Sequence, residues 1–149
     1  MPENANFKGF TLVEIMLVTA VLGVLASLAL PGLTRVKARA NESAARAALK
    51  TIASAQLSYR VTHQTYAELG DLGNDTPPYI DDNLASGVKN NYDFTSSGDA
   101  NSFVAAAVPS SNTTPIRSFC ITEDGVLRTS PAITSDIGHD DCQGYVSAE

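Results

Sequence analysis

The sequence predicts an α+β fold, in which a long N-terminal helix packs by its second half against a small antiparallel sheet of about four strands. Three observations predict this architecture of helix and sheet: an apolar run over residues 10–30, an amphipathic helical repeat that follows it, and four short strand-like runs after residue 91. With 149 residues, the chain has the length of a single domain.

The apolar run begins at Phe10 and ends at Leu30, and Glu14 is the only charged residue among its 21 members. At about 1.5 Å per residue, a helix of this length spans about 30 Å, the thickness of the hydrocarbon core of a bilayer. We therefore expect a single membrane-spanning helix. A cleavable secretory signal fits less well, because the run is too long and no Ala-x-Ala-like site closes it.

The helix is expected to continue after Pro31 and Gly32, since the next Gly or Pro is Gly70. Its residues are mostly strong helix formers. Pro31 is expected to kink or loosen the helix, because proline lacks the backbone donor and clashes with the preceding turn. The helix should end near residues 61–64. Apolar residues at helical spacing predict a buried stripe: Ala45, Ala48, Leu49, Ile52, Ala55 and Tyr59.

Shorter elements are expected after the helix. Thr65 to Glu68 has capping-box spacing and predicts a short helix that runs to Leu69 and stops at Gly70. Residues 70–91 are rich in turn formers and predict a loop.

Strands are predicted at residues 92–95, 102–108, 116–122 and 126–129. A hairpin loop with Gly125 in a left-handed conformation would place Ile121 opposite Leu127. These two residues and Phe119 would share the apolar face that packs on the helix stripe. After Ser130 the sequence predicts irregular chain.

Charge is segregated along the chain. Residues 10–60 carry six bases against two acids, a net charge of +4, and residues 61–149 carry three bases against thirteen acids, a net charge of −10. The acidic part argues against general attraction to nucleic acid, so we expect no specific nucleic-acid partner. The basic stretch suits anionic lipid headgroups or the acidic part of another copy. Counting bases beside the span would place residues 35–39 in the cytoplasm.

The chain has two cysteines, Cys120 and Cys142. A bond between them would need an oxidising compartment and would close a loop of about 20 residues, worth about 3 kcal/mol in the chain-entropy model. Two buried reduced thiols are the alternative reading of the same pattern.

The sequence contains no nucleophile–base arrangement and no nucleotide-binding motif, so we expect neither enzymatic activity nor a cofactor. Four residues near the C-terminus could in principle hold a cation, but a solvated acidic loop fits them better, and no metal is expected. They are Asp136, His139, Asp140 and Asp141.

The stretch G-F-T-L-V-E at residues 9–14, followed by I-M-L-V-T-A-V-L-G-V-L-A-S-L without a charge, resembles the class III signal of type IV pilins and type II secretion pseudopilins. The order of helix, sheet and C-terminal cysteine pair is similar to a type IVa pilin. The resemblance implies a leader peptide at residues 1–9, a membrane-spanning and polymerising half-helix at 10–33, and a globular head at 34–149. The leader departs from the family in having one base, Lys8, and one acid, Glu3.

The resemblance assigns roles to three residues at the start of the helix. Prepilin peptidase would cut after Gly9 and leave Phe10 as an N-methylated terminus, and Glu14 would be used for subunit docking. Physical reasoning agrees, since a carboxylate in hydrocarbon is costly unless it is paired. The new amine of Phe10, in the same subunit or a neighbouring one, would be its counter-ion one helical turn away.

The resemblance also covers residues further along the chain. Pro31 and Gly32 match the helix-breaking pair around which pilin helices loosen on assembly, although the second proline that many pilins carry is absent near Thr51. Cys120 and Cys142 match the disulfide that bounds the C-terminal region. The family orientation puts the leader in the cytoplasm and the head outside, against the count of basic residues.

The implied function is that of a structural subunit, the major pilin, of a type IV pilus. Expected partners are copies of the chain, prepilin peptidase, the inner membrane before assembly, and the assembly platform with its motor ATPases. The precursor would reside in the bacterial inner membrane and the product in an extracellular filament used for cell adhesion, twitching motility or DNA uptake. The alternatives are a type II secretion pseudopilin and a minor pilin with an adhesive or DNA-uptake role.

Overall fold

The computed structural model describes residues 9–110, 117–130 and 137–148, with the side chains of 28–33 excepted. The chain divides into two compact units, Met1–Val36 and Lys37–Glu149, and each is described here by itself. We call the second unit the head.

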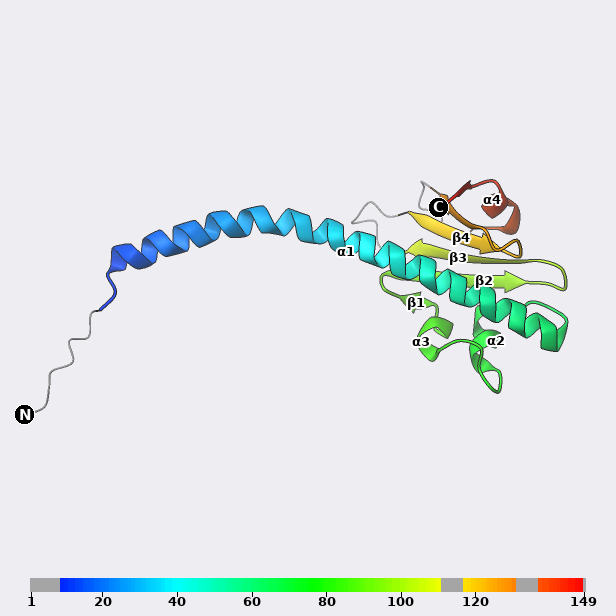
Figure 1. Cartoon of the computed structure of the whole chain (residues 1–149). Helices are drawn as coiled ribbons and strands as arrows, with labels where there is room; N and C mark the ends of the chain where they lie inside the picture. The colour runs from blue at the N-terminus through cyan, green and yellow to red at the C-terminus, as the bar shows by residue number, and fades with distance from the viewer. Residues whose placement is uncertain (1–8, 111–116, 131–136, 149) are drawn as a thin grey trace, which may run out of the picture. The chain divides into compact units, whose positions relative to one another are not determined.

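Helix α1 (Leu12–His63) contributes residues to both units (Figure 1). It ends within the predicted range, and Gln64 follows in the left-handed region at φ 58°. The assigned helix includes Pro31 and Gly32. Loosening of the helix at this pair during assembly therefore stays a prediction. Among the residues whose side chains are described, no helix offers an apolar stretch long enough to cross a bilayer.

The head contains a six-stranded antiparallel sheet in which neighbours in sequence are neighbours in space, so the order is β1-β2-β3-β4-β5-β6. The strands are β1 (Val88–Lys89), β2 (Tyr92–Gly98), β3 (Phe103–Pro109), β4 (Ser118–Thr122), β5 (Leu127–Ser130) and β6 (Val146–Ser147). The four predicted strands are confirmed as β2 to β5, whereas the two-residue strands at the edges were not predicted.

The predicted hairpin between β4 and β5 is confirmed in register and in turn conformation. Ile121 pairs with Leu127, and Gly125 has a φ of 73°. A glycine suits this position because a side chain at positive φ is strained. The pairing puts Phe119 and Ile121 on the buried face.

Three short helices correct the sequence analysis: α2 (Leu69–Asn74), α3 (Asp82–Ala85) and α4 (His139–Gln143). The expected helix ending at Gly70 is wrong, because α2 begins at Leu69 and the Thr65 hydroxyl donates to the carbonyl of Tyr66 instead of capping it. The expected loop over 70–91 contains α2, α3 and β1. The expected irregular chain after Ser130 contains α4 and β6.

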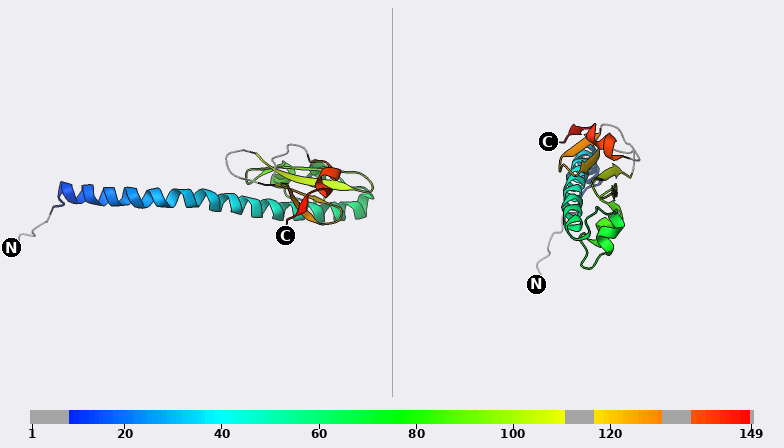
Figure 2. Two further views of the ribbon diagram at one scale, coloured as in Figure 1. Left: turned by 90° about the horizontal axis from the view of Figure 1, so that it is seen from above. Right: turned by 90° about the vertical axis from the view of Figure 1, so that its right-hand side faces the viewer.

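The core of the head lies between the second half of α1 and one face of the sheet (Figure 2). The predicted stripe is confirmed: its five apolar residues from Ala45 to Ala55 are buried, and Tyr59 is partly buried. Leu49 and Ile52 are fully buried beside Phe119, and Leu127 packs against the same cluster. The helix stripe therefore completes a core that the sheet alone would leave open.

A buried polar residue interrupts the stripe and ties three elements together. The side-chain amide of Gln56 donates to the carbonyl of Ala67 at 2.6 Å and to the hydroxyl of Ser96 at 2.7 Å, and its oxygen accepts from the Ala67 amide at 2.9 Å. These bonds join α1 to the segment before α2 and to β2.

Candidate assembly segment and head surface

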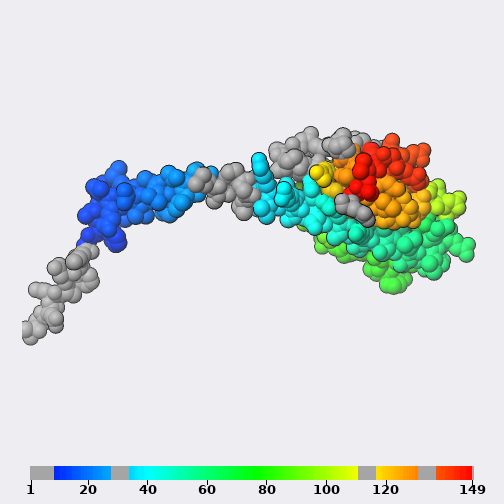
Figure 3. All heavy atoms as spheres, turned by 45° about the horizontal axis from the view of Figure 1, so that its top comes forward, coloured from blue at the N-terminus to red at the C-terminus, as the bar shows by residue number. Residues whose placement is uncertain are grey.

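The apolar side chains at the start of α1 are exposed. Within the first unit, Leu12, Val13 and Leu17 expose 75%, 73% and 67% of their surface, and every described residue from 9 to 27 is classed as exposed (Figure 3, blue). An apolar surface of this extent marks a place of contact with other molecules or with lipid. We call residues 10–27 the assembly segment.

The first turn of the assembly segment is capped by Thr11. The backbone amide of Glu14 donates to the Thr11 hydroxyl at 3.2 Å, and the amide of Ile15 donates to the Thr11 carbonyl at 3.3 Å. A threonine three residues before a glutamate is the capping-box pattern, which was overlooked in T-L-V-E. The helix dipole also favours a carboxylate in this turn, so Glu14 is locally compatible with the helix start.

The other polar side chains of the assembly segment are satisfied within the helix. The Thr19 hydroxyl lies 3.0 Å from the carbonyls of Ile15 and Met16, and the Ser27 hydroxyl lies 2.7 Å from the carbonyl of Val24. Such hydroxyls can enter apolar surroundings without losing a hydrogen bond. Glu14 is the one charged residue of this segment, and no described residue forms an ion pair with it.

Gly9 and Phe10 precede the helix and are exposed, with Phe10 exposing 79% of its surface. A Cβ atom added to Gly9 would meet nothing within 4 Å, and its φ lies outside the left-handed region. The fold of this chain therefore does not require glycine at position 9. Residues 1–8 lie outside the described part.

The head places Cys120 and Cys142 in a disulfide. The S–S distance is 2.06 Å and the Cα atoms are 5.9 Å apart. The bond joins β4 to α4 on the sheet face opposite α1, in a small cluster with Val104, Ala106 and Ile137. The pairing implied by the family resemblance is thus present, and the alternative of two free thiols is excluded.

A second connection to α4 is electrostatic. His139 Nε2 lies 3.0 and 2.9 Å from the two carboxylate oxygens of Glu123. The hydrogen bond to Glu123 raises the pKa of His139. Burial acts to raise the pKa of Glu123, but hydrogen bonds from backbone amides and from His139 outweigh it, and the pKa is lowered.

The alternative of a cation at the C-terminal acids has no support in the described residues, which hold no group of three metal-ligating side chains. His139 instead contacts Glu123 and, at 3.5 Å, Asp140. Asp136 lies outside the described part of the chain. No local pattern in the sequence indicates the Glu123–His139 pair, since 16 residues separate its members.

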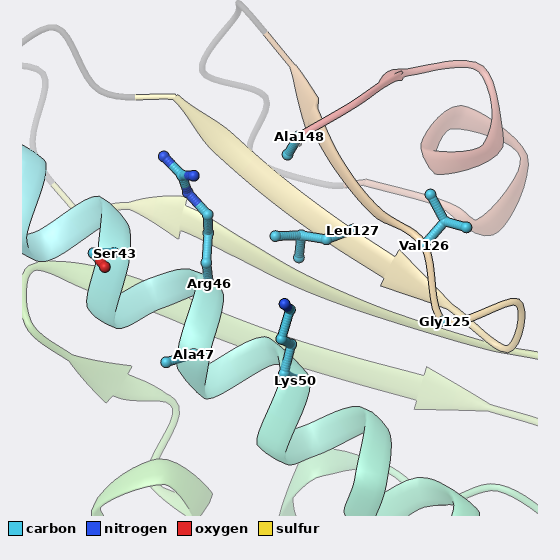
Figure 4. Close-up of a pocket in the computed structure, with 8 residues that line it drawn as sticks. All are labelled: Ser43, Arg46, Ala47, Lys50, Gly125, Val126, Leu127 and Ala148. Atoms are coloured by element: carbon cyan, nitrogen blue, oxygen red, sulfur yellow. The ribbon is translucent and has the colours of Figure 1, made fainter.

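A hollow of about 450 Å³ lies on the head between α1 and the strands β5 and β6 (Figure 4). Two cationic side chains of α1, Arg46 and Lys50, line it together with Ala47, Leu127 and Ala148. We call it the basic hollow.

Comparison with known proteins places the chain among pilus subunits. The family model described as type IV minor pilin ComP, DNA uptake sequence receptor, matches residues 31–122, and the model of the prokaryotic N-terminal methylation motif matches residues 4–30.

Curated relatives point the same way. The type IV wide pilus major component PilA4 of Thermus thermophilus is 29% identical over 135 residues, which are 87% of this chain and 93% of that protein. The type IV major pilin protein PilA of Myxococcus xanthus is 35% identical over 68 residues, 46% of this chain and 31% of that protein. A type IV major pilin protein PilE1 of Neisseria gonorrhoeae is 36% identical over 89 residues, 60% of this chain and 38% of that protein. The matches thus cover nearly all of the first relative but less than half of the other two. The ComP family model, which matches residues 31–122, covers more than half of this chain. The chain therefore belongs to the type IV pilin family.

Proposed function

We propose that the chain is the major subunit of a type IV pilus, and that it polymerises through the assembly segment after cleavage between Gly9 and Phe10. Support comes from the Thermus relative, a major pilus component whose similarity extends over 87% of this chain. The methylation-motif match over residues 4–30 supports N-methylation of Phe10.

The observation that carries the proposal is the exposure of the assembly segment. Its apolar side chains are exposed, so lipid or other subunits would have to bury them. In a filament, the same residues of neighbouring copies would supply that burial. The head keeps its own core and would form the outer shell.

Glu14 would set the axial register between subunits. Apolar helices in contact can slide along one another, whereas a buried ion pair is favourable at one offset only. Cleavage would create a positive amine at Phe10, four residues before Glu14, and that amine or the one of a neighbouring subunit would neutralise the carboxylate. The capping of the helix by Thr11 fixes the start of the helix beside this charge.

Before assembly the precursor would reside in the bacterial inner membrane, with residues 1–9 in the cytoplasm and the head outside. The sequence supports this by the 21 residues from Phe10 to Leu30 with a single charge, and the disulfide supports it by requiring an oxidising compartment for the head. Prepilin peptidase, an assembly platform and its motor ATPases would be the partners. Pro31 and Gly32 would let α1 loosen as the subunit leaves the membrane.

The test is N-terminal mass spectrometry on filaments sheared from the cell surface. We expect one major protein that begins with N-methylated Phe10 and ends with the head intact. A Gly9→Ala variant tests leader cleavage between Gly9 and Phe10. A Cβ atom at this exposed position contacts nothing, so we expect the variant to fold normally and any reduction to appear in the cleavage of the leader. Filaments whose subunits retain residues 1–9 would contradict the proposal.

A second candidate is a minor pilin that takes up DNA, and the family model over residues 31–122 favours it, since that model describes a DNA uptake sequence receptor. Deletion of the gene separates the candidates. Loss of all filaments indicates the major subunit, whereas retained filaments with lost DNA uptake indicate the minor one. The net charge of −10 over residues 61–149 means that any DNA contact would have to use a local basic patch.

A further inference from the structure

The basic hollow contains two cations, and one of them, Lys50, has no ion-pair partner among the described residues. Arg46 stacks over the Phe119 ring at 5.1 Å and has Glu42 3.8 Å from its guanidinium, but its Nε atom is buried without a hydrogen-bond partner among the described atoms. Lys50 is exposed and forms no ion pair with any described residue. Figure 4 shows Lys50 extending from α1 toward Leu127. The hollow therefore has room and donors for an anionic group.

Exposed acidic residues lie at the other edge of the sheet. Glu68, Asp71 and Asp82 flank or belong to α2 and α3, and none of them forms an ion pair within the described chain. The nearby Asp75 and Asp81 differ, because His63 and Lys89 contact them at 3.4 and 3.2 Å. We call residues 68–82 the acidic segment.

The sheet order separates the two surfaces. The acidic segment and its helices pack beside β1 and β2, whereas the basic hollow borders β5 and lies next to β6. Figures 1 and 2 both show the green α2 and α3 and the red C-terminal chain on different sides of the head. One head thus presents a cationic surface at one edge and an anionic surface at the other.

Complementary surfaces at different places on one molecule associate head to tail, and such contacts generate open helical assemblies when the rotation does not close. We propose that the basic hollow receives a carboxylate from the acidic segment of a second copy of this chain. The proposal rests on the proposed function, since it names the contact between heads in the filament. Lys50 is the primary cation, and Arg46 adds a second positive charge to the lining of the same hollow.

The test uses purified filaments treated with a carbodiimide, which joins amines to carboxylates in direct contact without adding atoms. Covalent dimers are separated by electrophoresis and digested, and mass spectrometry locates the joined residues. We expect Lys50 linked to Glu68, Asp71 or Asp82 of another copy. A link from Lys50 to a carboxylate of its own chain, or to a different carboxylate of a neighbour, overturns the proposal, as does the absence of any Lys50 link.

Two variants provide matched controls. Lys50→Ala removes the unpaired cation from an exposed position, whereas Lys50→Arg keeps a positive charge at the same position. Filaments with Lys50→Ala should dissociate at a lower temperature than the original in low salt, and added salt should lower that temperature less, because the screened contact is already gone. Filaments with Lys50→Arg should keep the salt response of the original. An unchanged dissociation temperature and salt response in Lys50→Ala filaments would overturn the proposal. If no filament contains the chain, the proposed function fails instead.

Discussion

Two stretches of helix α1 carry apolar residues that differ in their exposure to solvent. In the assembly segment Leu17 exposes 67% of its surface, whereas Leu49, further along the same helix, is fully buried. The residues around Leu49 stabilise the fold of their own chain, because they pack against the sheet in the core of the head. Those around Leu17 contribute nothing to that core. Apolar composition alone therefore does not show whether a helix residue serves folding or assembly. What matters is whether the same chain covers the face of the helix on which the residue lies.

The sharpest way to test this division is a change at Glu14. Replacing Glu14 with Gln should abolish filaments, because the docking charge is lost, and should leave the unfolding midpoint of the head unchanged, because Glu14 lies outside its core. Electron microscopy of sheared surface fractions and urea unfolding of the detergent-solubilised chain measure the two effects. Ser27→Ala is the control within the same segment, since the hydroxyl bonds only to its own helix. Normal filaments from the Glu14 variant would refute the docking role.

The disulfide should produce the converse pattern. Replacing Cys120 and Cys142 together with Ser should lower the free energy of unfolding of the head by about 3 kcal/mol, because the broken bond no longer restricts the unfolded chain. Insertion and leader cleavage should proceed as before. Urea unfolding and a gel assay for processing follow both. If leader cleavage failed while the head kept its free energy of unfolding, the disulfide would act on processing and not on the stability of the head. The separation of roles between the assembly segment and the core of the head would then be wrong.

A substitution of Gln56 tests how much one buried polar residue stabilises the core of the head. Gln56→Leu should cost about 2 kcal/mol, because the amide and carbonyl of Ala67 lose their partners in a buried place. Ser54→Ala on the exposed face of the same helix should change the free energy of unfolding by no more than about 0.5 kcal/mol. Equal effects of the two substitutions in urea unfolding would show that the Gln56 bonds carry no net stability.

The smallest effect is expected at the Glu123–His139 pair. The pKa of His139 is raised, so the pair stabilises the fold below the ordinary histidine pKa of 6.5 and loses this contribution as pH rises through the raised value. The pKa of Glu123 is lowered, so the contribution is also lost when pH falls through that lowered value. His139→Ala should therefore lower the melting temperature by a few degrees at a pH of about 5.5 and by less at a pH of about 8.5. A difference that grows with pH would contradict the assignment.

Much of the fold could be predicted because its signals are local. The periodicity from Ala45 to Ala55 marked the buried face, and Gly125 marked the turn that pairs Ile121 with Leu127. The helix end near residue 63 followed from composition in the same way.

What was missed depends on contacts between distant parts of the chain. The Thr65 hydroxyl had the spacing of a cap, but α2 begins at Leu69, where Leu69 and Leu72 reach the core. The short edge strands form because the neighbouring strand supplies partners, not because their two residues favour extended chain. The buried stripe predicted from the sequence did not include Gln56, although Gln56 lies seven residues after Leu49 and is fully buried. The Thr11 cap was also missed, although its signal is local.

The shortness of β1 and β6 has a consequence for a fibre built from such subunits. Each of these outermost strands is two residues long. A long, unpaired strand edge templates hydrogen bonding with any other edge that it meets, and crowding many identical copies would then favour amyloid-like fusion. Heads whose edge strands are this short can be packed at high local concentration and still separate as individual folded units when the fibre is taken apart.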